Sequence, residues 1–173
     1  MYKSNYEAYS FLRDDPQKNL ACDFEILSDE VASKIGNLIA NIEEKDLCDE
    51  LRFVCELTYH LNPTLRTFLS VSDEEFDVLL EKYINIKEKT KSRCKMFVLP
   101  VGSKTATLSH IIRNNYKALS RIAYNQERLG RQVPDKLHDF LGLLSNYFFY
   151  LSLYLNMQDG IEEIEFKSRN YKL

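Results

Sequence analysis

The sequence is poor in the residues that interrupt helices. Its 173 residues include only five glycines and four prolines, and it has neither internal repeats nor low-complexity tracts. Because glycine and proline dominate turns and linkers, their scarcity favours a compact helical domain over a β-rich or linker-rich chain. The length predicts one domain that can bury a core without crosslinks.

Long apolar runs are also missing. No segment approaches the roughly 20 apolar residues of a membrane-spanning helix. The N-terminal sequence MYKSNYEAYSFLRDD lacks the apolar centre of a signal peptide. We therefore expect a cytoplasmic protein without membrane contact.

Several classes of site are not indicated. A net charge of −3 and a pI near 5.7 argue against a general nucleic-acid binder. P-loop, G-x-S-x-G and dinucleotide-binding motifs are absent. The histidines are too far apart for a zinc motif, and the cysteines show no C-x-x-C spacing, so no metal site is expected. These residues are His60, His110, His138, Cys22, Cys48, Cys55 and Cys94.

Apolar periodicity predicts five helices. The first is expected to start at Ser28, whose hydroxyl can cap it, and the second to run from about Lys45 to Leu61. A capping box, Ser72 to Glu75, opens the third, which fades within the charged segment 87–93. Ser103 is expected to cap a fourth helix that ends near residue 126.

The fifth helix is expected from about Pro134 to Asn156. It is apolar on nearly all sides, so it lies at the centre of the domain or is covered by a partner, and we expect an oligomer. Residues 1–24 are predicted to form an aromatic-rich N-terminal arm, and residues 25–173 the bundle domain. The tail from Ile161 to Phe166 alternates apolar and acidic residues, which indicates a short strand or an extended strap.

The stretch from Met96 to Arg121 combines an apolar run, a Pro/Gly turn and a basic stripe. Pro100 ends the apolar run, because the residue before proline avoids the helical region. The fourth helix then places one basic side chain every three or four residues on a single face, namely His110, Arg113, Lys117 and Arg121. This stripe is either a solvated helix face or a contact for an anion or a second subunit.

The segments FVLPVGS, SHIIR and LLSNYFFYLSLYLN resemble the ATP:cobalamin adenosyltransferases of the trimeric five-helix-bundle class. The resemblance extends from about residue 23 to residue 156. It implies an all-α, five-helix up-and-down bundle that forms a homotrimer with the site between subunits. It also implies cobalamin (a corrinoid) and ATP as ligands, and a cobalamin-dependent enzyme as a possible recipient of the product.

By this resemblance, Phe97 packs under the corrin ring and excludes the axial base. The alternative is that Phe97 is a core residue. Asp29 matches an aspartate that pairs with the arginine at the position of Arg113. Such a pair is either a surface bridge or a contact between subunits. Lys117, Arg121 and Asn146 fall in the nucleotide motifs.

The nucleotide motifs depart from the family pattern. No glycine precedes Gly36, so the N-terminal T-x-x-G-D-x-G-x-[ST] loop is missing, and R-R-x-E-R is replaced by K-A-L-S-R at 117–121. N-R-L-S-D likewise becomes G-L-L-S-N at 142–146.

Three hypotheses follow from these departures. The first is a working adenosyltransferase that binds ATP through Lys117, Arg121 and cations of the arm. Those cations are Lys3, Arg13 and Lys18. The second is a non-catalytic corrinoid binder, and the third is a structural or interaction protein.

Overall fold

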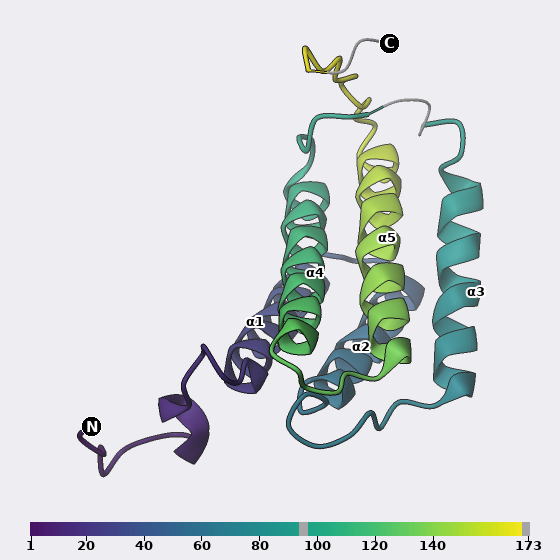
Figure 1. Ribbon diagram of the computed structural model, residues 1–173. Helices are drawn as coiled ribbons and strands as arrows, with labels where there is room; N and C mark the ends of the chain where they lie inside the picture. Colours follow the sequence, from purple (N-terminus) through teal and green to yellow (C-terminus); the bar gives the residue numbers. More distant parts are fainter. Residues whose placement is uncertain (94–96, 171–173) are drawn as a thin grey trace.

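The structure is a computed structural model that describes residues 1–93 and 97–170. Five α-helices occur in these residues, preceded by a short 3-10 turn, η1 (Figure 1). The elements are η1 (Ser10–Arg13), α1 (Ala21–Ile39), α2 (Lys45–Leu61), α3 (Asp73–Lys89), α4 (Lys104–Arg128) and α5 (Asp135–Gln158).

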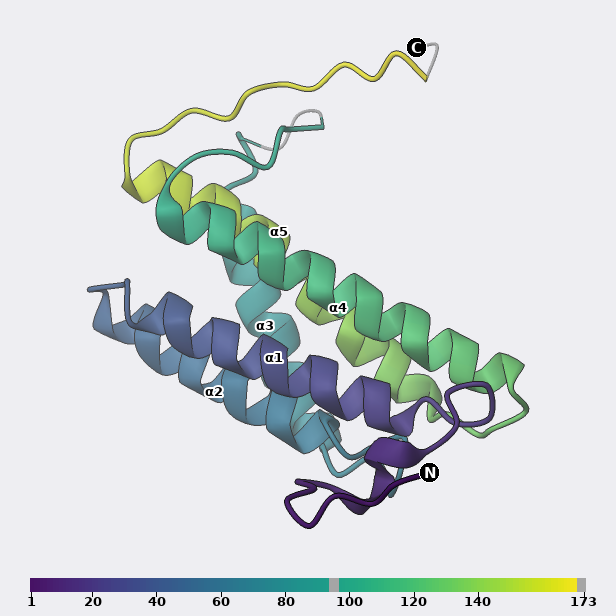
Figure 2. The ribbon, with the colours of Figure 1, turned by 90° about the vertical axis from the view of Figure 1, so that its left-hand side faces the viewer.

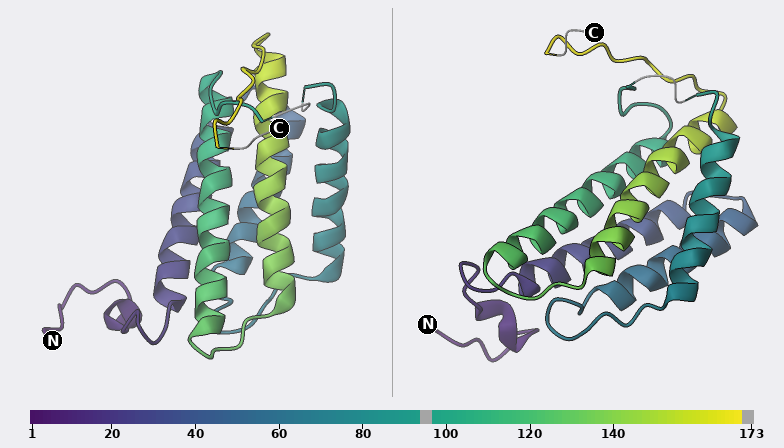
Figure 3. Two further views of the ribbon diagram at one scale, coloured as in Figure 1. Left: turned by 45° about the horizontal axis from the view of Figure 1, so that its top comes forward. Right: turned by 45° about the vertical axis from the view of Figure 1, so that its right-hand side comes forward.

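The helices form an up-and-down bundle around the antiparallel pair α4 and α5. α1 packs against both α2 and α4, and α3 packs against α5. Figure 3 shows α5 between α4 and α3, with α1 beside α4. The predicted all-α five-helix bundle is thus confirmed. None of the helices in the described ranges is long and apolar enough to cross a membrane.

The burial of α5 follows from this central position. Phe140, Tyr147 and Phe148 are completely buried, and most other α5 side chains are buried as well. Tyr147 also donates a hydrogen bond to Glu50 Oε1 at 2.6 Å, which links α5 to α2. The nearly all-round apolar pattern of α5 is therefore satisfied largely within one chain.

The start of α1 was predicted wrongly. The helix begins at Ala21, and Ser28 lies inside it, where its buried hydroxyl donates to the carbonyl of Phe24 at 2.8 Å. A serine inside a helix can bond the preceding turn as readily as it caps a helix start. Phe24 is fully buried, so core packing extends the helix towards the N-terminus. Residues 21–24 consequently belong to α1 and not to the arm.

The other helix starts agree with the sequence. The capping box at α3 is complete: Ser72 Oγ accepts from the amide of Glu75 at 3.2 Å, and the amide of Ser72 donates to Glu75 Oε2 at 2.7 Å. Ser103 Oγ accepts from the amide of Ala106 at 3.2 Å and caps α4. α2 has the predicted bounds.

The N-terminal arm lies at the end of the bundle where α4 finishes and α5 starts (Figure 2). The buried side chain of Gln126 accepts from the amide of Leu20 at 2.8 Å and donates to Asn19 Oδ1 at 2.9 Å. Arg131 Nε donates to the carbonyl of Lys18 at 2.8 Å. The final part of the arm is therefore held on its own chain.

Candidate functional site

Phe97 lies on a short two-stranded ribbon that projects from the bundle at the opposite end from the arm (Figure 1). The ribbon joins residues 97–99 to residues 164–166 through an antiparallel bridge between Val98 and Glu165. Its hydrogen bonds run from the amide of Phe166 to the carbonyl of Phe97 (2.7 Å) and from the amide of Leu99 to the carbonyl of Ile164 (2.9 Å). Residues 161–166, predicted as a short strand or an extended strap, form an extended strap with one bridged residue, Glu165. Met96 lies outside the described residues.

The pairing gives the ribbon an apolar face. Because side chains alternate along a strand, Phe97, Leu99, Ile164 and Phe166 share one side, with Phe97 opposite Phe166. Phe97 is 74% exposed, which excludes the alternative that it is a core residue. Phe166 was not singled out from the sequence as a site residue, although the alternation in the strap could have indicated it. Its position beside Phe97 depends on the strand register, which only the fold provides.

The basic stripe on α4 divides into buried and exposed parts. His110 is only 3% exposed, and Arg113 is half-buried. Both lie against α5: the Arg113 guanidinium is 5.5 Å from the centre of the Phe149 ring, and the His110 ring is 6.4 Å from it. Lys117 and Arg121 are exposed. A solvated face thus describes the second half of the stripe but not His110.

The buried half of the stripe has polar atoms without partners. His110 Nδ1 and Arg113 Nε are both buried and accept or donate no hydrogen bond within the described part of the chain. Burial lowers the pKa of His110 to about 4, with smaller contributions from the charges of Arg113 and Lys117. Burial also lowers the pKa of Arg113, and burial with the Arg113 charge lowers that of Lys117. This region would be stabilised by an anion or a carboxylate.

Asp29 does not supply that carboxylate within one chain. Its Oδ1 accepts a hydrogen bond from the hydroxyl of Tyr59 at 2.6 Å, and this bond with the nearby negative charge raises the pKa of Tyr59. Asp29 and Tyr59 are both exposed, so the carboxylate remains on the surface. A pair between Asp29 of one subunit and Arg113 of another stays a prediction.

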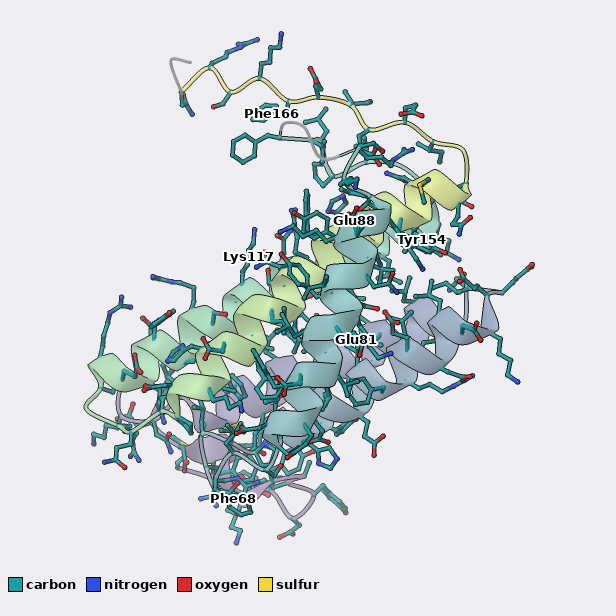
Figure 4. The ribbon with its side chains drawn as sticks, turned by 90° about the vertical axis from the view of Figure 1, so that its right-hand side faces the viewer. Phe68, Glu81, Glu88, Lys117, Tyr154 and Phe166 are labelled. Carbon is teal, nitrogen blue, oxygen red and sulfur yellow. The ribbon has the colours of Figure 1, made fainter. Side chains whose placement is uncertain are left out.

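The nucleotide candidates lie on α4 and α5. Lys117 projects from α4 on the side of the bundle over which the strap extends (Figure 4). Asn146 is exposed on α5, next to Ser145, whose hydroxyl donates to the carbonyl of Arg113 at 3.4 Å. Lys117 is about 20 Å along α4 from the helix start that follows the ribbon. The aromatic part of the candidate site thus lies on the ribbon before α4, and the cationic part lies on α4 itself.

Two of the three candidate cations of the arm, Arg13 and Lys18, already have partners. Arg13 Nε is 2.7 Å from Glu7 Oε1, and Lys18 Nζ is 3.5 Å from Asp15 Oδ2. The arm also lies at the far end of the bundle from the C-terminal strap, which pairs with the segment that carries Phe97 (Figure 2). Lys3 is exposed near the N-terminus. The arm of this one chain thus does not join its cations to Phe97.

No metal-binding group of three or more histidine, cysteine, aspartate or glutamate residues is found among residues 1–93 and 97–170. Cys22, Cys48 and Cys55 are free thiols, and burial is the main cause that raises the pKa of Cys22 and Cys55. Cys94 lies outside the described residues.

The model of the cobalamin adenosyltransferase family matches residues 25–155, which is most of the chain. The chain belongs to this family. Its similarity to individual members is distant: it is 27% identical over 147 residues to the corrinoid adenosyltransferase of Bacillus subtilis (strain 168), covering 80% of this chain and 76% of that protein. The strap and Phe166 lie beyond the matched residues.

Solved structures with the same fold include variants of an enzyme from Lactobacillus reuteri. A PduO-type ATP:corrinoid adenosyltransferase variant with phenylalanine replaced by histidine, bound to cobalamin and ATP, superposes with a TM-score of 0.78 at 22% identity, covering 96% of this chain and 98% of that chain. An arginine-to-lysine variant bound to ATP gives a TM-score of 0.75 at 24% identity, covering 90% and 89%. At these identities the likeness concerns the fold.

Proposed function

We propose that this protein is an ATP:corrinoid adenosyltransferase that uses cob(I)alamin and ATP. In this reaction the electron pair of Co(I) attacks the 5′ carbon of ATP. A Co–C bond forms, the C5′–O bond breaks and triphosphate leaves. The observation that carries the proposal is the placement of Phe97. In this member of the family, the Phe97 side chain is 74% exposed and lies on a ribbon outside the core.

Phe97 would contact the lower face of the corrin ring. A phenyl ring is bulky and rigid and cannot ligate cobalt, so it can exclude the axial base without replacing it. Phe166, across the ribbon from Phe97, would extend the apolar surface. Removal of the axial base makes cob(II)alamin easier to reduce to the Co(I) nucleophile.

Lys117 would hold the triphosphate, together with Arg121 and with Asn146 on the neighbouring helix. The substituted phenylalanine and arginine of the two L. reuteri variants stand 20 positions apart, as do Phe97 and Lys117. The arginine-to-lysine variant of that enzyme was solved with ATP bound. A lysine at this position is therefore compatible with a bound nucleotide in a protein of this fold, although it lacks the planar fork of arginine.

A second candidate function is corrinoid binding without catalysis. It is favoured by the missing glycine-rich loop and by the ion pairs that already occupy Arg13 and Lys18 of the arm. Such a protein would keep the surface around Phe97 and serve as a carrier or sensor. The third hypothesis is an interaction protein that keeps only the bundle. It gives no role to the exposed Phe97.

One titration separates these functions. Cob(II)alamin is mixed with the protein, ATP is added stepwise, and the absorbance of four-coordinate cob(II)alamin is followed. The adenosyltransferase gives this species only when ATP is present, and Phe97→Ala abolishes it. If the protein binds the corrinoid equally well with and without ATP, the second function is the correct one. No binding of either ligand rejects both.

A further inference from the structure

The ribbon that carries Phe97 is tied to the helices by a polar network at its base. Asn156, in the last turns of α5, is 1% exposed. Its Oδ1 accepts from the amide of Ser103 at 3.0 Å, and its Nδ2 donates to the carbonyl of Val101 at 3.2 Å and to Glu163 Oε1 at 3.4 Å. One side chain therefore joins the turn before α4, the end of α5 and the strap.

Arg93 completes the network from the segment after α3. Its Nε donates to Glu163 Oε2 at 2.7 Å, and its Nη2 donates to the carbonyl of Ile161. The side chains of Arg93 and Glu163 are only 12% and 7% exposed. In a buried pair of this kind, removal of one partner leaves an uncompensated charge, so the network resists rearrangement.

The turn before α4 fits closely against Asn156. Gly102 has a φ of +142°, and a Cβ atom placed on it would lie 2.0 Å from Asn156 Oδ1. Only a glycine can therefore stand where the amide of Asn156 contacts the turn. The path of the chain between the ribbon and α4 is determined by this contact.

The ribbon needs such an anchor. Two short strands are only marginally stable by themselves in water, and the exposed Phe97 ring obtains no support from the core. We propose that Asn156, Glu163 and Arg93 are positioning residues, which set the place of Phe97 relative to α4 without touching the substrate. The catalytic consequence of this role rests on the proposed function.

Two neighbouring glutamates provide a matched test. Glu163→Gln removes the buried charge, whereas Glu162→Gln makes the same change at a side chain that is 89% exposed and 3.6 Å from Arg93 Nη1. Hydrogen–deuterium exchange of the free protein is measured at the ribbon amides of Leu99 and Phe166. Glu163→Gln should raise their exchange about tenfold, as expected for loss of a charge-assisted bond. Glu162→Gln should leave the exchange of these two amides unchanged. Neither variant should change the exchange of the amides of α4 and α5.

Three results would overturn the positioning role: ribbon amides that are unprotected in the native chain, no increase in Glu163→Gln, or an equal increase in Glu162→Gln. A second readout uses cob(II)alamin with ATP. There, Glu163→Gln should lower the four-coordinate fraction while corrinoid affinity stays within about twofold. Equal four-coordinate fractions in both variants and the native chain would contradict an effect on Phe97. A native chain that binds no corrinoid would reject the proposed function, while the exchange experiment would still decide the positioning role.

Discussion

The environment of His110 in the structure differs from the one that its place in the sequence indicates. On a helical wheel it belongs to a basic stripe, but in the fold it is 3% exposed and lies against the Phe149 ring. A charge at this position would face Arg113 and Lys117 in a poorly solvated site. His110 is therefore neutral at neutral pH, and the stripe carries fewer charges than its sequence indicates.

This burial predicts a pH dependence of stability. The pKa of His110 is about 4 in the folded chain against 6.5 for an ordinary histidine, so between these values the unfolded chain binds more protons. The free energy of unfolding should fall by up to about 3 kcal/mol as the pH falls from 6.5 to 4. Urea unfolding across this range should show this decrease in the free energy of unfolding for the native chain. In His110→Gln much of the pH dependence should be lost. The exposed His60→Gln serves as the control, and an unchanged slope in His110→Gln would contradict the prediction.

Lys117 carries the prediction on nucleotide binding. Lys117→Ala should weaken ATP binding about tenfold, because a charge-assisted contact to phosphate is lost. Lys117→Arg should keep or strengthen binding, since it restores the planar fork. Isothermal titration with ATP measures both. Equal affinity in Lys117→Ala and the native chain would place the triphosphate elsewhere.

Gly102 and Gly36 should respond in opposite ways to alanine. At Gly102 the positive φ and the contact with Asn156 make Gly102→Ala destabilising by about 2 kcal/mol or more. Gly36 lies in α1, and a Cβ atom added to it would meet no atom of another element within 4 Å, so Gly36→Ala should stabilise by up to about 1 kcal/mol. Thermal unfolding of the two variants tests this contrast. Similar shifts would mean that the turn before α4 tolerates a side chain.

At the scale of elements, local signals determined most helix starts. Ser72 and Ser103 cap α3 and α4 as their neighbouring residues indicate, because capping is satisfied within a few residues. The start of α1 could not be read locally, because burial of Phe24 against other helices outweighs the capping tendency of Ser28. The sequence indicated the strap but not its pairing with the segment of Phe97, since the two strands are more than 60 residues apart.

The capping box provides the prediction for this scale. Ser72→Ala removes the acceptor for the amide of Glu75 and should lower the free energy of unfolding by about 1 kcal/mol. Ser10→Ala, at an exposed serine of η1, is the control. Chemical denaturation measures both variants. A loss of equal size in each would mean that the box adds no specific stabilisation.

At the scale of the whole molecule, one chain leaves surfaces that a homotrimer would complete. Arg113 Nε has no partner in the described part of the chain, and Asp29 lies on the surface with only Tyr59. Both observations favour the proposal that the Asp29–Arg113 pair joins two subunits.

Trimer formation is tested by the same pair. Arg113→Ala should lower the apparent mass by analytical ultracentrifugation, because the partner aspartate would lose its counter-charge at the interface. Arg52→Ala changes an exposed arginine on α2 and should leave the mass unaltered. An unaltered mass in Arg113→Ala would mean that the pair does not support the assembly.

The sequence by itself determined the helical class, the order and most bounds of the helices, and the family, because periodicity, caps and the F-x-L-P segment are local properties. Only the tertiary structure decided that Phe97 stands outside the core opposite Phe166, that His110 is buried, and that Asn156 and Arg93 anchor the ribbon. These features depend on contacts between segments far apart in the chain, whose register and burial no local pattern contains.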